Sequence, residues 1–536
     1  MVRLFQNCIF EAPSLAENLP AWYHAAMAKR KLSEIIDDTL ILERHGAGDP
    51  NILSLKYDSR EAAEGVLFFA LPGIHTDGHD YIPDAVRRGA AAVVHSRPLS
   101  QYKDGTIYLR VEDTRRVMSP ISAEFYRHPS KELTVIGVTG TDGKSTTVSF
   151  IHQLLESAGF KAGFLSTVQF NTGGRTEKNH FRQSTPEAPE IHRILRTMRE
   201  AGCTHAVVEA TSHGLSKVNN RLGSVSFDIG VFTNISKEHL EFHKTFEQYL
   251  YDKANLFRSL RADRGKAVIN LDDPNAPYLI DAGPERALTY SVKNPGADIF
   301  ASGITDRGEG QDIVLRYRGD TMQTLEFPLY LPLPGRFNVE NLLAALGAVF
   351  SLPDSEPKDY IAHIHKLLPV KGRMVPVRLG QPFEVLVDYA HTPGSFEKLF
   401  PQLRERARGR LIALFGSAGE RDLEKRSCLG EIASRYSDII VLADEDPRGE
   451  EPRAVLEAVA AGCADKQEGE DLLIIEDRGT AIRHAFSLAE KDDLVVLLGK
   501  GHEGSIIYND GPIPWDEEQE AVKALDEMGY SGYKEE

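Results

Sequence analysis

Short hydrophobic runs alternate with longer stretches of helical periodicity through the middle of the chain. The run at 133–137 has the composition of a strand and leads directly into a glycine-rich turn. Between Val148 and Leu155 the apolar residues recur at helical intervals, and Gly159 ends the pattern. Strands that alternate with helices predict a mostly parallel, doubly wound α/β sheet. Further strand-like runs occur at 205–210, 227–235 and 266–271.

The same alternation recurs on both sides of this segment. Before it, the apolar run 65–71 is followed by a helix-like segment up to Arg88 and by a strand-like run at 90–94. After residue 369, segments of helical length separate five apolar runs, at 383–389, 410–416, 438–446, 472–477 and 493–499. In such sheets, ligands bind at the carboxyl ends of the strands. We therefore predict three α/β domains, at residues 1–130, 131–368 and 369–536.

Length and composition agree with three domains of ordinary size. The chain has 536 residues, of which 41% are hydrophobic and 26% charged, the balance of a globular protein. Its formal net charge is −17, with acidic and basic residues intermixed, which argues against nonspecific binding to nucleic acids or membrane surfaces. A local basic pocket for an anionic ligand is still compatible with that charge.

The cysteines are scattered, and none of them pair at the spacing of a metal site. This usage is typical of a reduced, cytoplasmic protein. No apolar run approaches the roughly 20 residues that span a bilayer. Residues 1–30 lack an apolar core of the signal-peptide kind, and we assign them no function. The cysteines are Cys8, Cys203, Cys428 and Cys463.

A glycine-rich segment, Gly140-Thr-Asp-Gly-Lys-Ser-Thr146, lies between a predicted strand and a predicted helix. Glycines allow backbone amides to turn toward a phosphate, and a helix N-terminus favours an anion. Lys144 is placed to reach the β- and γ-phosphates of ATP, and the Ser145 hydroxyl to bind Mg²⁺. This context favours a phosphate loop over a turn with a solvated lysine. The candidate ATP-binding residues are Gly140, Thr141, Asp142, Gly143, Lys144, Ser145 and Thr146.

Two residues that follow neighbouring strands could complete a magnesium site at these phosphates. Glu209 comes at the end of one strand, and His239 follows the next. Alone, Glu209 could be a surface acid and His239 a hydrogen-bonded structural residue. Their position beside a phosphate loop favours the functional interpretation, because carboxylate oxygens suit Mg²⁺.

From about residue 31 onward, the chain resembles the Mur ligase superfamily, and within it the UDP-N-acetylmuramoyl-tripeptide synthetase family. The matching motifs occur in order along the sequence. They are the phosphate loop, Ser184–Glu187, Glu209–Leu215, Thr233–His243, Tyr249–Lys253, Leu333–Val339, Asp388–Pro393, Arg421–Arg426, Asp446–Arg448 and Gly499–Glu503.

This resemblance implies a three-domain Mur ligase architecture, with a central P-loop ATP-binding domain and a Rossmann-like C-terminal domain. The N-terminal domain would hold the UDP end of the substrate, and the C-terminal domain the incoming amino acid. By their positions in the family motifs, Asn338 and Arg373 would contact ATP. The residues matched to UDP-substrate contacts are Tyr57, Ser59, His75, Ser184, Thr185, Thr211 and Arg221. Those matched to the amino-acid site are Arg421, Asp446, Arg448, Gly499 and Glu503.

By composition, Lys253 is an ordinary lysine on a predicted helix. The resemblance implies instead that it reacts with CO₂ and becomes N6-carboxylysine, a carbamate whose oxygens would bind a second Mg²⁺. An unmodified ammonium would repel the metal. The family thus implies a metal-binding set of Ser145, Glu209, His239 and the Lys253 carbamate, and a catalytic set of Lys144, Glu209, His239 and Lys253.

The reaction of the family implies that the γ-phosphate of ATP passes to the terminal carboxylate of UDP-N-acetylmuramoyl-L-alanyl-D-glutamate. The amine of a third amino acid would then attack the acyl phosphate, which is a step of peptidoglycan synthesis. No side chain is needed as a nucleophile, because positioning and charge stabilisation supply the catalysis. We expect domain closure around the substrates, with the hinge at residues 366–371. We also expect a monomer whose partners are these small molecules.

The identity of the added amino acid stays open. Asp446 stands where family members that add meso-diaminopimelate have Asn. An ionised Asp cannot donate a hydrogen bond to a distal carboxylate and would favour an ammonium, whereas Arg448 suits a carboxylate. Meso-diaminopimelate, L-lysine and L-ornithine are all retained, with a slight preference for an acceptor without the second carboxylate. Asp142 also stands where the family has Asn, and the interval from Thr211 to Arg221 is longer than usual.

Two alternative functions follow from the same motifs. A folylpolyglutamate synthetase would share the central and C-terminal architecture, but Tyr57–Arg60 and Asp446–Arg448 argue against it. A nucleotide-binding regulator that has lost catalysis would show damage in the catalytic set. All four of those residues, Lys144, Glu209, His239 and Lys253, are intact.

Overall fold

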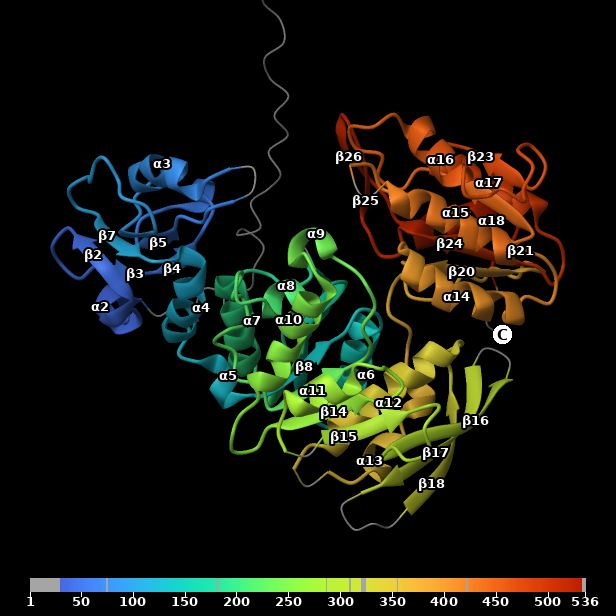
Figure 1. The fold of residues 1–536 in the computed structure, drawn as a ribbon, viewed down its shortest axis with the longest axis horizontal. Helices are drawn as coiled ribbons and strands as arrows, with labels where there is room; N and C mark the ends of the chain where they lie inside the picture. Colours follow the sequence, from blue (N-terminus) through green and yellow to red (C-terminus); the bar gives the residue numbers. More distant parts are fainter. Residues whose placement is uncertain are drawn as a thin grey trace, which may run out of the picture.

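Three β-sheets, each with its own hydrophobic core, form three lobes along the chain, with the central lobe between the other two (Figure 1). The structure, a computed structural model, describes residues 29–532 apart from 74–75, 180, 182, 286, 308–309, 320–323, 354 and 421–422. Parallel strands connected by helices dominate all three sheets. The α/β, doubly wound prediction is therefore confirmed.

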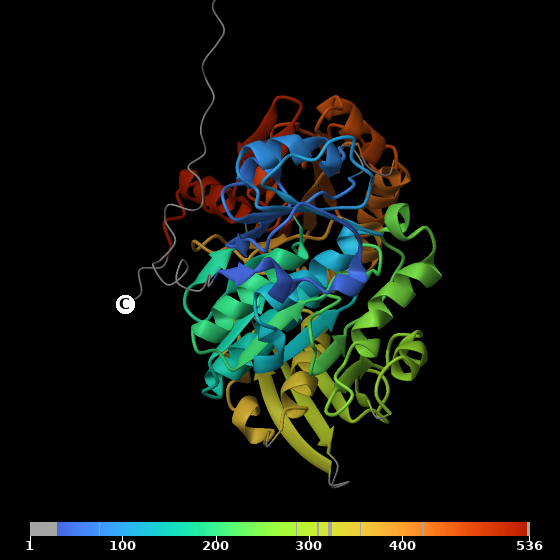
Figure 2. The same ribbon diagram turned by 90° about the vertical axis from the view of Figure 1, so that its left-hand side faces the viewer.

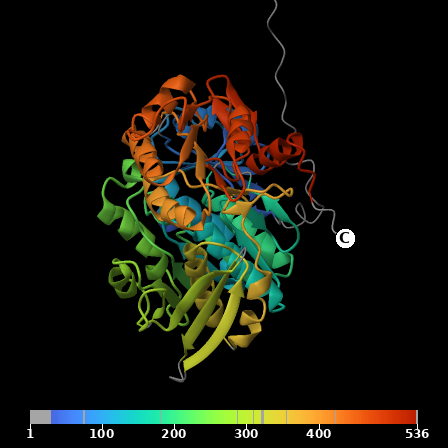
Figure 3. The same ribbon diagram turned by 90° about the vertical axis from the view of Figure 1, so that its right-hand side faces the viewer.

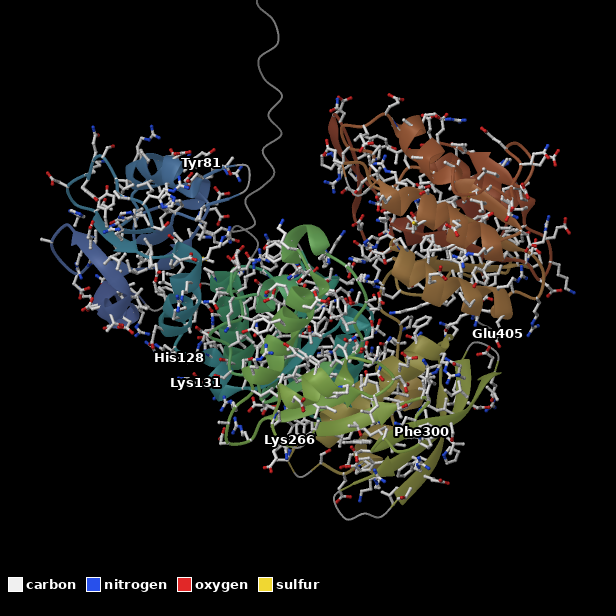
Figure 4. The ribbon with its side chains drawn as sticks, viewed as in Figure 1. Tyr81, His128, Lys131, Lys266, Phe300 and Glu405 are labelled. Carbon is white, nitrogen blue, oxygen red and sulfur yellow. The ribbon has the colours of Figure 1, made fainter. Side chains whose placement is uncertain are left out.

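The N-terminal lobe is a five-stranded sheet of order β2-β7-β6-β5-β4. Only β2 runs antiparallel to its neighbour. Helix α4 (Thr114–Phe125) is capped by the Asp113 carboxylate, which accepts from the backbone N–H of Arg115 at 2.8 Å. His128 and Lys131, labelled in Figure 4, lie where this lobe continues through α5 (Pro129–Glu132) into the central lobe. The strands are β2 (Ile41–His45), β4 (Ser54–Lys56), β5 (Val66–Phe69), β6 (Ala92–His95) and β7 (Ile107–Val111).

The central lobe contains an eleven-stranded sheet of order β11-β10-β9-β12-β8-β13-β14-β15-β16-β17-β18. From β9 to β16 the strands are parallel, and two separate hydrophobic cores cover the two faces, as parallel sheets require. Its inner strands are β8 (Thr134–Thr139), β9 (Ala162–Leu165), β12 (His205–Glu209), β13 (Ile229–Phe232), β14 (Lys266–Asn270) and β15 (Ala287–Ser291). The short strands at one edge are β10 (Gln169–Asn171) and β11 (Thr176–Lys178). Its main helices are α6 (Lys144–Ser157), α7 (Ala188–Glu200), α10 (Phe246–Arg258) and α12 (Arg336–Phe350).

An antiparallel extension of this sheet was not predicted. It consists of β16 (Ile299–Arg307), β17 (Gly310–Arg318) and β18 (Thr324–Leu331). Figures 2 and 3 show these strands at the bottom of the central lobe, below both the N-terminal and the C-terminal lobes. One face of the extension is partly exposed, so its apolar residues alternate with polar ones and form no continuous hydrophobic run.

The C-terminal lobe is a six-stranded sheet of order β19-β20-β24-β21-β22-β23, parallel except for β19. Side chains from α14, α15 and α16 fill the core on one face, and side chains from α17 and α18 fill the core on the other. The strands are β19 (Val375–Pro376), β20 (Glu384–Asp388), β21 (Leu411–Phe415), β22 (Ile439–Leu442), β23 (Leu472–Ile474) and β24 (Leu494–Leu498). The helices are α14 (Pro393–Arg406), α15 (Glu424–Tyr436), α16 (Pro452–Ala460), α17 (Arg478–Leu488) and α18 (Glu517–Glu527).

A buried ion pair joins α17 to α18. Nη2 of Arg478 lies 2.6 Å from Oε1 of Glu517, and both side chains are inaccessible to solvent. Arg478 also donates to the carbonyl of Leu498 at 2.7 Å, and the indole of Trp515 donates to Glu517 at 2.6 Å. These hydrogen bonds offset the cost of burying two charges. They also fix the last helix on the sheet.

The state of the cysteines and the hydropathy of the helices can be compared with the sequence predictions. Cys203, Cys428 and Cys463 are free thiols, as expected for a reduced protein, and Cys8 lies outside the described residues. Within the described ranges, no helix combines the length and the hydropathy that crossing a membrane requires.

Candidate active site

The glycine-rich segment forms a tight loop between β8 and α6. Gly140 and Gly143 have φ angles of +151° and +81°, a region that favours glycine. A Cβ at Gly140 would lie 1.9 Å from Oγ1 of Thr233, and one at Gly143 would lie 2.2 Å from Oδ1 of Asn341. The loop therefore fits between the end of β13 and α12 only because these two positions lack side chains.

Thr233 and Asn234, which follow β13, fasten this loop. Oγ1 of Thr233 donates to the carbonyl of Asp142 at 2.6 Å, and the N–H of Asp142 donates to Oδ1 of Asn234 at 3.1 Å. In the sequence analysis, both residues belong to the motif Thr233–His243, but a role is assigned only to His239 within it. Their contact with the loop could have been predicted, because β13 and β8 are parallel neighbours whose carboxyl ends meet at one edge of the sheet.

Glu209 and Ser145, both predicted metal ligands, lie together beneath the loop. Glu209 is the last residue of β12 and is 1% exposed. Its Oε2 accepts from the Ser145 hydroxyl at 2.8 Å, and Thr167 donates to the two carboxylate oxygens from its N–H and its hydroxyl, each at 2.8 Å. Thr167 was not predicted, because it lies on the loop after β9 and belongs to no recognised motif. The result is a hydroxyl and a carboxylate fixed at the start of α6.

His239 lies against other aromatic rings beside the loop. Its ring centroid is 5.0 Å from that of His213 and 6.4 Å from that of Tyr249. The side chain is 42% exposed, and Nε2 lies 3.8 Å from Glu238. Among the residues that the structure describes, no group of three His, Cys, Asp or Glu side chains is close enough to hold a metal ion. A metal at this site would therefore need other oxygen donors.

Lys253, on α10, reaches the loop from within the protein. Its side chain is 1% exposed, and Nζ donates to the carbonyl of Gly140 at 2.5 Å. The same nitrogen lies 4.5 Å from the centre of the Tyr249 ring. Burial, together with the neighbouring Lys144 ammonium, lowers the pKa of Lys253 well below its ordinary value. The site therefore favours the neutral amine, which is the form that reacts with CO₂.

The residues matched to the sugar and peptide of the substrate lie at the end of β12. Oγ1 of Thr185 is 2.8 Å from Oγ1 of Thr211 and donates to the carbonyl of Glu209 at 3.0 Å. Nη1 of Arg221 donates to the carbonyl of Thr185 at 3.0 Å, and Nη2 lies 2.9 Å from Glu187. The long interval between Thr211 and Arg221 thus leaves the arginine beside Thr185. Ser184, next to Thr185, is half-buried.

The uridine-side residues lie in the N-terminal lobe. Tyr57 is half-buried just after β4, and burial together with the acidic Glu190 and Glu187 at the start of α7 raises its pKa. The phenol therefore faces the central lobe. Ser59, two residues later, is buried. His75 lies outside the described residues.

Asn338 lies in the first turn of α12, and Arg373 lies in the segment that enters the C-terminal lobe. Nδ2 of Asn338 donates to the carbonyl of Pro334 at 2.7 Å, and the side chain is buried. The Arg373 guanidinium lies over the Tyr389 ring at 4.7 Å. Burial raises the pKa of Asp142 in the loop, but the charges of Lys398, then Lys144 and then Arg373 hold it below its ordinary value.

A buried lysine, Lys500, lies at the centre of the candidate amino-acid site. The sequence analysis assigned this residue no role. Nζ of Lys500 is inaccessible to solvent and lies 2.9 Å from Oδ1 of Asp446 and 2.5 Å from Oε2 of Glu503. The N–H of Ile507 also donates to Oδ1 of Asp446 at 2.9 Å, and the Tyr389 hydroxyl donates to Glu503 at 3.1 Å. Asp446 is therefore not an isolated carboxylate, although its expected repulsion of a distal carboxylate depended on that assumption. Lys500 offsets its charge.

Arg448 lies two residues after Asp446 and has a buried guanidinium nitrogen. Within the described part of the chain, its buried Nε has no hydrogen-bond partner. Its backbone φ of +56° places it in the left-handed region, and its N–H donates to the carbonyl of Ile507 at 2.8 Å. Gly499 follows β24, where a Cβ would lie 2.6 Å from Glu445. Arg421 lies outside the described residues.

The chain matches known proteins over most of its length. Three families match successive parts of the chain: the Mur ligase catalytic domain at residues 51–126, the Mur ligase middle domain at 138–349, and the Mur ligase glutamate ligase domain at 372–501. A solved structure of a UDP-N-acetylmuramoyl-L-alanyl-D-glutamate–2,6-diaminopimelate ligase shares 28% identity, with a TM-score of 0.62. The match covers 94% of this chain and 100% of that one.

Closer relatives share nearly the whole length. A UDP-N-acetylmuramyl-tripeptide synthetase of Treponema denticola is 45% identical over 523 residues, which cover 92% of this chain and 98% of the relative. Another, from Roseiflexus sp. (strain RS-1), is 48% identical over 498 residues, which cover 90% and 96%. The resemblance inferred from the motifs is confirmed. The chain is a ligase that belongs to the Mur ligase family, together with the UDP-N-acetylmuramyl-tripeptide synthetases.

Proposed function

We propose that this protein uses ATP to join a diamino acid to the terminal carboxylate of UDP-N-acetylmuramoyl-L-alanyl-D-glutamate in peptidoglycan synthesis. The γ-phosphate passes to that carboxylate, the amine of the acceptor attacks the resulting acyl phosphate, and inorganic phosphate leaves. One observation supports this function above all: Lys253 and the Ser145–Glu209 pair converge on a single phosphate loop. The proposal divides the chain into UDP-substrate, ATP and amino-acid domains at residues 1–130, 131–368 and 369–536.

The phosphate loop would hold two anions close together during the first step. The ATP phosphates and the substrate carboxylate repel each other, and the Lys144 ammonium and the loop amides are placed to offset that repulsion. Lys144 donates to the carbonyl of Thr141 at 2.7 Å, a hydrogen bond that it would exchange for a phosphate oxygen. The three lobes would supply the remaining acceleration by fixing the orientation of the three substrates.

Magnesium fits the donors at this site. Ser145 and Glu209 offer the hard oxygen ligands that Mg²⁺ prefers, and Mg²⁺ commonly completes its shell with phosphate oxygens and water. We propose that Lys253, as a carbamate, and His239 hold a second ion. Such ions would stabilise the charge that develops on the transferred phosphoryl group. Carbamylation would replace a buried amine with an anion that faces this region.

The acceptor site supports a substrate with more than one charged group. Glu503 would bind an ammonium, and the guanidinium of Arg448, whose buried Nε has no partner among the described residues, would bind a carboxylate. Since Lys500 offsets the charge of Asp446, that residue does not by itself exclude a distal carboxylate. Meso-diaminopimelate, L-lysine and L-ornithine therefore stay equal candidates at this point.

Parallel assays with each acceptor test the function. The protein is incubated with ATP, Mg²⁺, UDP-N-acetylmuramoyl-L-alanyl-D-glutamate and one of the three acceptors, while phosphate release and product mass are measured together. We expect phosphate release with one acceptor and a product heavier by that residue. Turnover with folate and glutamate instead would establish a folylpolyglutamate synthetase. Tight ATP binding without phosphate release under any of these conditions would establish a regulator that lacks catalysis.

A further inference from the structure

One face of α14 in the C-terminal lobe contacts the central lobe. Gly394, Lys398 and Gln402 are spaced four residues apart and lie on the same side of that helix. A Cβ at Gly394 would lie 3.5 Å from the hydroxyl of Ser236, and the side-chain carbonyl of Gln402 accepts from the N–H of Arg336 at 2.9 Å. The face therefore meets both the segment after β13 and the start of α12.

Lys398, in the middle of this face, contacts the phosphate loop itself. Its Nζ lies 2.6 Å from Oδ2 of Asp142 and 3.3 Å from Oδ1 of Asn234. Asp142 and Asn234 belong to the central lobe, and Lys398 belongs to the C-terminal lobe. The Lys398 ammonium, from the C-terminal lobe, is thus paired with the Asp142 carboxylate of the loop. Without this partner, the carboxylate would place an uncompensated negative charge beside the phosphates.

An aspartate at this position creates an electrostatic problem for a loop that binds ATP. The nucleotide phosphates are anionic, so an ionised Asp142 would weaken their binding unless a cation offsets it. Burial opposes ionisation of Asp142, but Lys398, followed by Lys144 and Arg373, holds the pKa of the carboxyl below its ordinary value. Asp142 is therefore charged at neutral pH, and the cation that contacts it belongs to another lobe.

We propose that Lys398 is a positioning residue: it neutralises Asp142 and thereby readies the phosphate loop for ATP when the C-terminal lobe is docked on the central lobe. This inference rests on the proposed function, since it assumes that the loop binds ATP. It assigns the C-terminal lobe a part in nucleotide affinity in addition to its part in binding the acceptor.

A double-mutant cycle tests the coupling. Lys398→Gln, Asp142→Asn and the double variant are compared with the wild type for kcat, for KM for ATP and for the Kd of ADP by calorimetry. We expect Lys398→Gln to raise KM for ATP about five- to tenfold while kcat changes by less than about twofold. In the Asp142→Asn background, the same Lys398→Gln change should alter KM by less than about twofold, because no charge is left to neutralise. The difference should shrink at high salt.

Lys466→Gln is the matched control. Lys466 pairs with Asp471 at 3.4 Å within the C-terminal lobe, so this variant also breaks a lysine–aspartate pair there, and it should leave KM for ATP unchanged. If Lys398→Gln weakens ATP binding equally with and without Asp142, or not at all, the proposal is wrong. If the wild type binds neither ATP nor ADP, the proposed function fails instead, and the calorimetry identifies that case.

Discussion

At the scale of single residues, the burial of Lys253 controls the chemistry of its amine. Lys253 is fully buried against the carbonyl of Gly140, and burial there disfavours the ammonium. A neutral amine is a nucleophile toward CO₂, so the same burial that penalises an unmodified lysine favours its modification. The anionic product would also gain from the neighbouring Lys144 cation.

Lys253→Met should abolish ligase activity, by at least about 100-fold in kcat, because it removes the carbamate oxygens proposed to bind a metal ion. Wild-type protein equilibrated with ¹³CO₂ should give a carbamate signal in ¹³C NMR, and the variant should not. Lys217→Met, on the exposed lysine near Tyr251, is the control and should keep both the signal and the activity. Full wild-type activity in buffer freed of CO₂ would contradict the carbamate.

His192 on α7 is a second buried group whose charge matters. Burial, with a smaller contribution from His128, lowers its pKa to about 3 from an ordinary 6.5, and neither ring nitrogen has a hydrogen-bond partner within the described residues. Between these two values the unfolded chain binds a proton that the folded chain excludes. Stability should therefore fall as the pH falls below 6.5.

His192→Leu should remove this pH dependence. At pH 5 the effect of His192 amounts to roughly 2 kcal/mol of unfolding free energy relative to neutral pH. Other buried histidines act in the same direction, so the quantity to measure is the difference in urea midpoint between variant and wild type at pH 7 and at pH 5. His365→Gln, at an exposed position, serves as the control. Parallel pH profiles for His192→Leu and wild type would show that His192 is not the cause.

At the scale of elements, close packing of α10 on β8 sets the position of Lys253. Gly137 lies in β8, where a Cβ would come within 2.6 Å of Leu256 and 2.8 Å of Phe227. Leu256 is on α10, three residues after Lys253, and both apolar side chains are buried. The helix can approach the sheet only because this strand position has no side chain.

Gly137→Ala should destabilise the central lobe by about 1–3 kcal/mol, because the added methyl group overpacks this contact. It should also lower kcat, because a displaced α10 moves Lys253 away from the loop. Gly174→Ala, at a position with no atom within 4 Å of the added Cβ, should change neither quantity. Urea unfolding and the ligase assay measure the two effects. Wild-type stability in Gly137→Ala would mean that the neighbouring side chains can move aside without cost.

Elements with strong periodicity could be predicted from the sequence, whereas long-range pairings could not. The runs at 133–137 and 205–210 became β8 and β12, and the glycine-rich loop lies between β8 and α6 as expected. The extension β16–β18 was missed because only continuous apolar runs were taken as strands, and the alternation that is typical of half-exposed strands was not used. The partners of Asp446 and Asp142 were missed because Lys500 and Lys398 are 54 and 256 residues away in the chain. Because the pairing with Lys500 was not foreseen, Asp446 was interpreted as an isolated negative charge.

At the scale of the whole molecule, the connection between the central and C-terminal lobes limits where closure can occur. Lys371 pairs with Asp516 at 2.6 Å, and the N–H of Gly372 donates to Glu518 at 2.9 Å, so both residues are fastened to the start of α18. On the other side, the N–H of Leu368 donates to Gln153 of α6 at 2.9 Å. Of the predicted hinge, residues 369–370 lie between these anchors and are the ones we propose to bend.

Ligands should bring the lobes closer together. We expect the radius of gyration from X-ray scattering to fall when a nonhydrolysable ATP analogue and the UDP substrate are both added, because the proposed sites lie in different lobes. The same ligands should leave Lys144→Met unchanged, since that variant lacks the cation that binds the phosphates. Identical scattering of the wild type with and without ligands would exclude closure as part of the cycle.

The buried pair between Arg478 and Glu517 also has a consequence for synthesis of the protein on the ribosome. Until residue 517 has emerged, Arg478 lacks the carboxylate to which it is hydrogen-bonded, and removal of one partner from a buried ion pair costs about 3–5 kcal/mol. The C-terminal lobe should therefore stay open to chaperones and proteases during translation, and a chain interrupted before α18 should be degraded rather than accumulate as a partial enzyme.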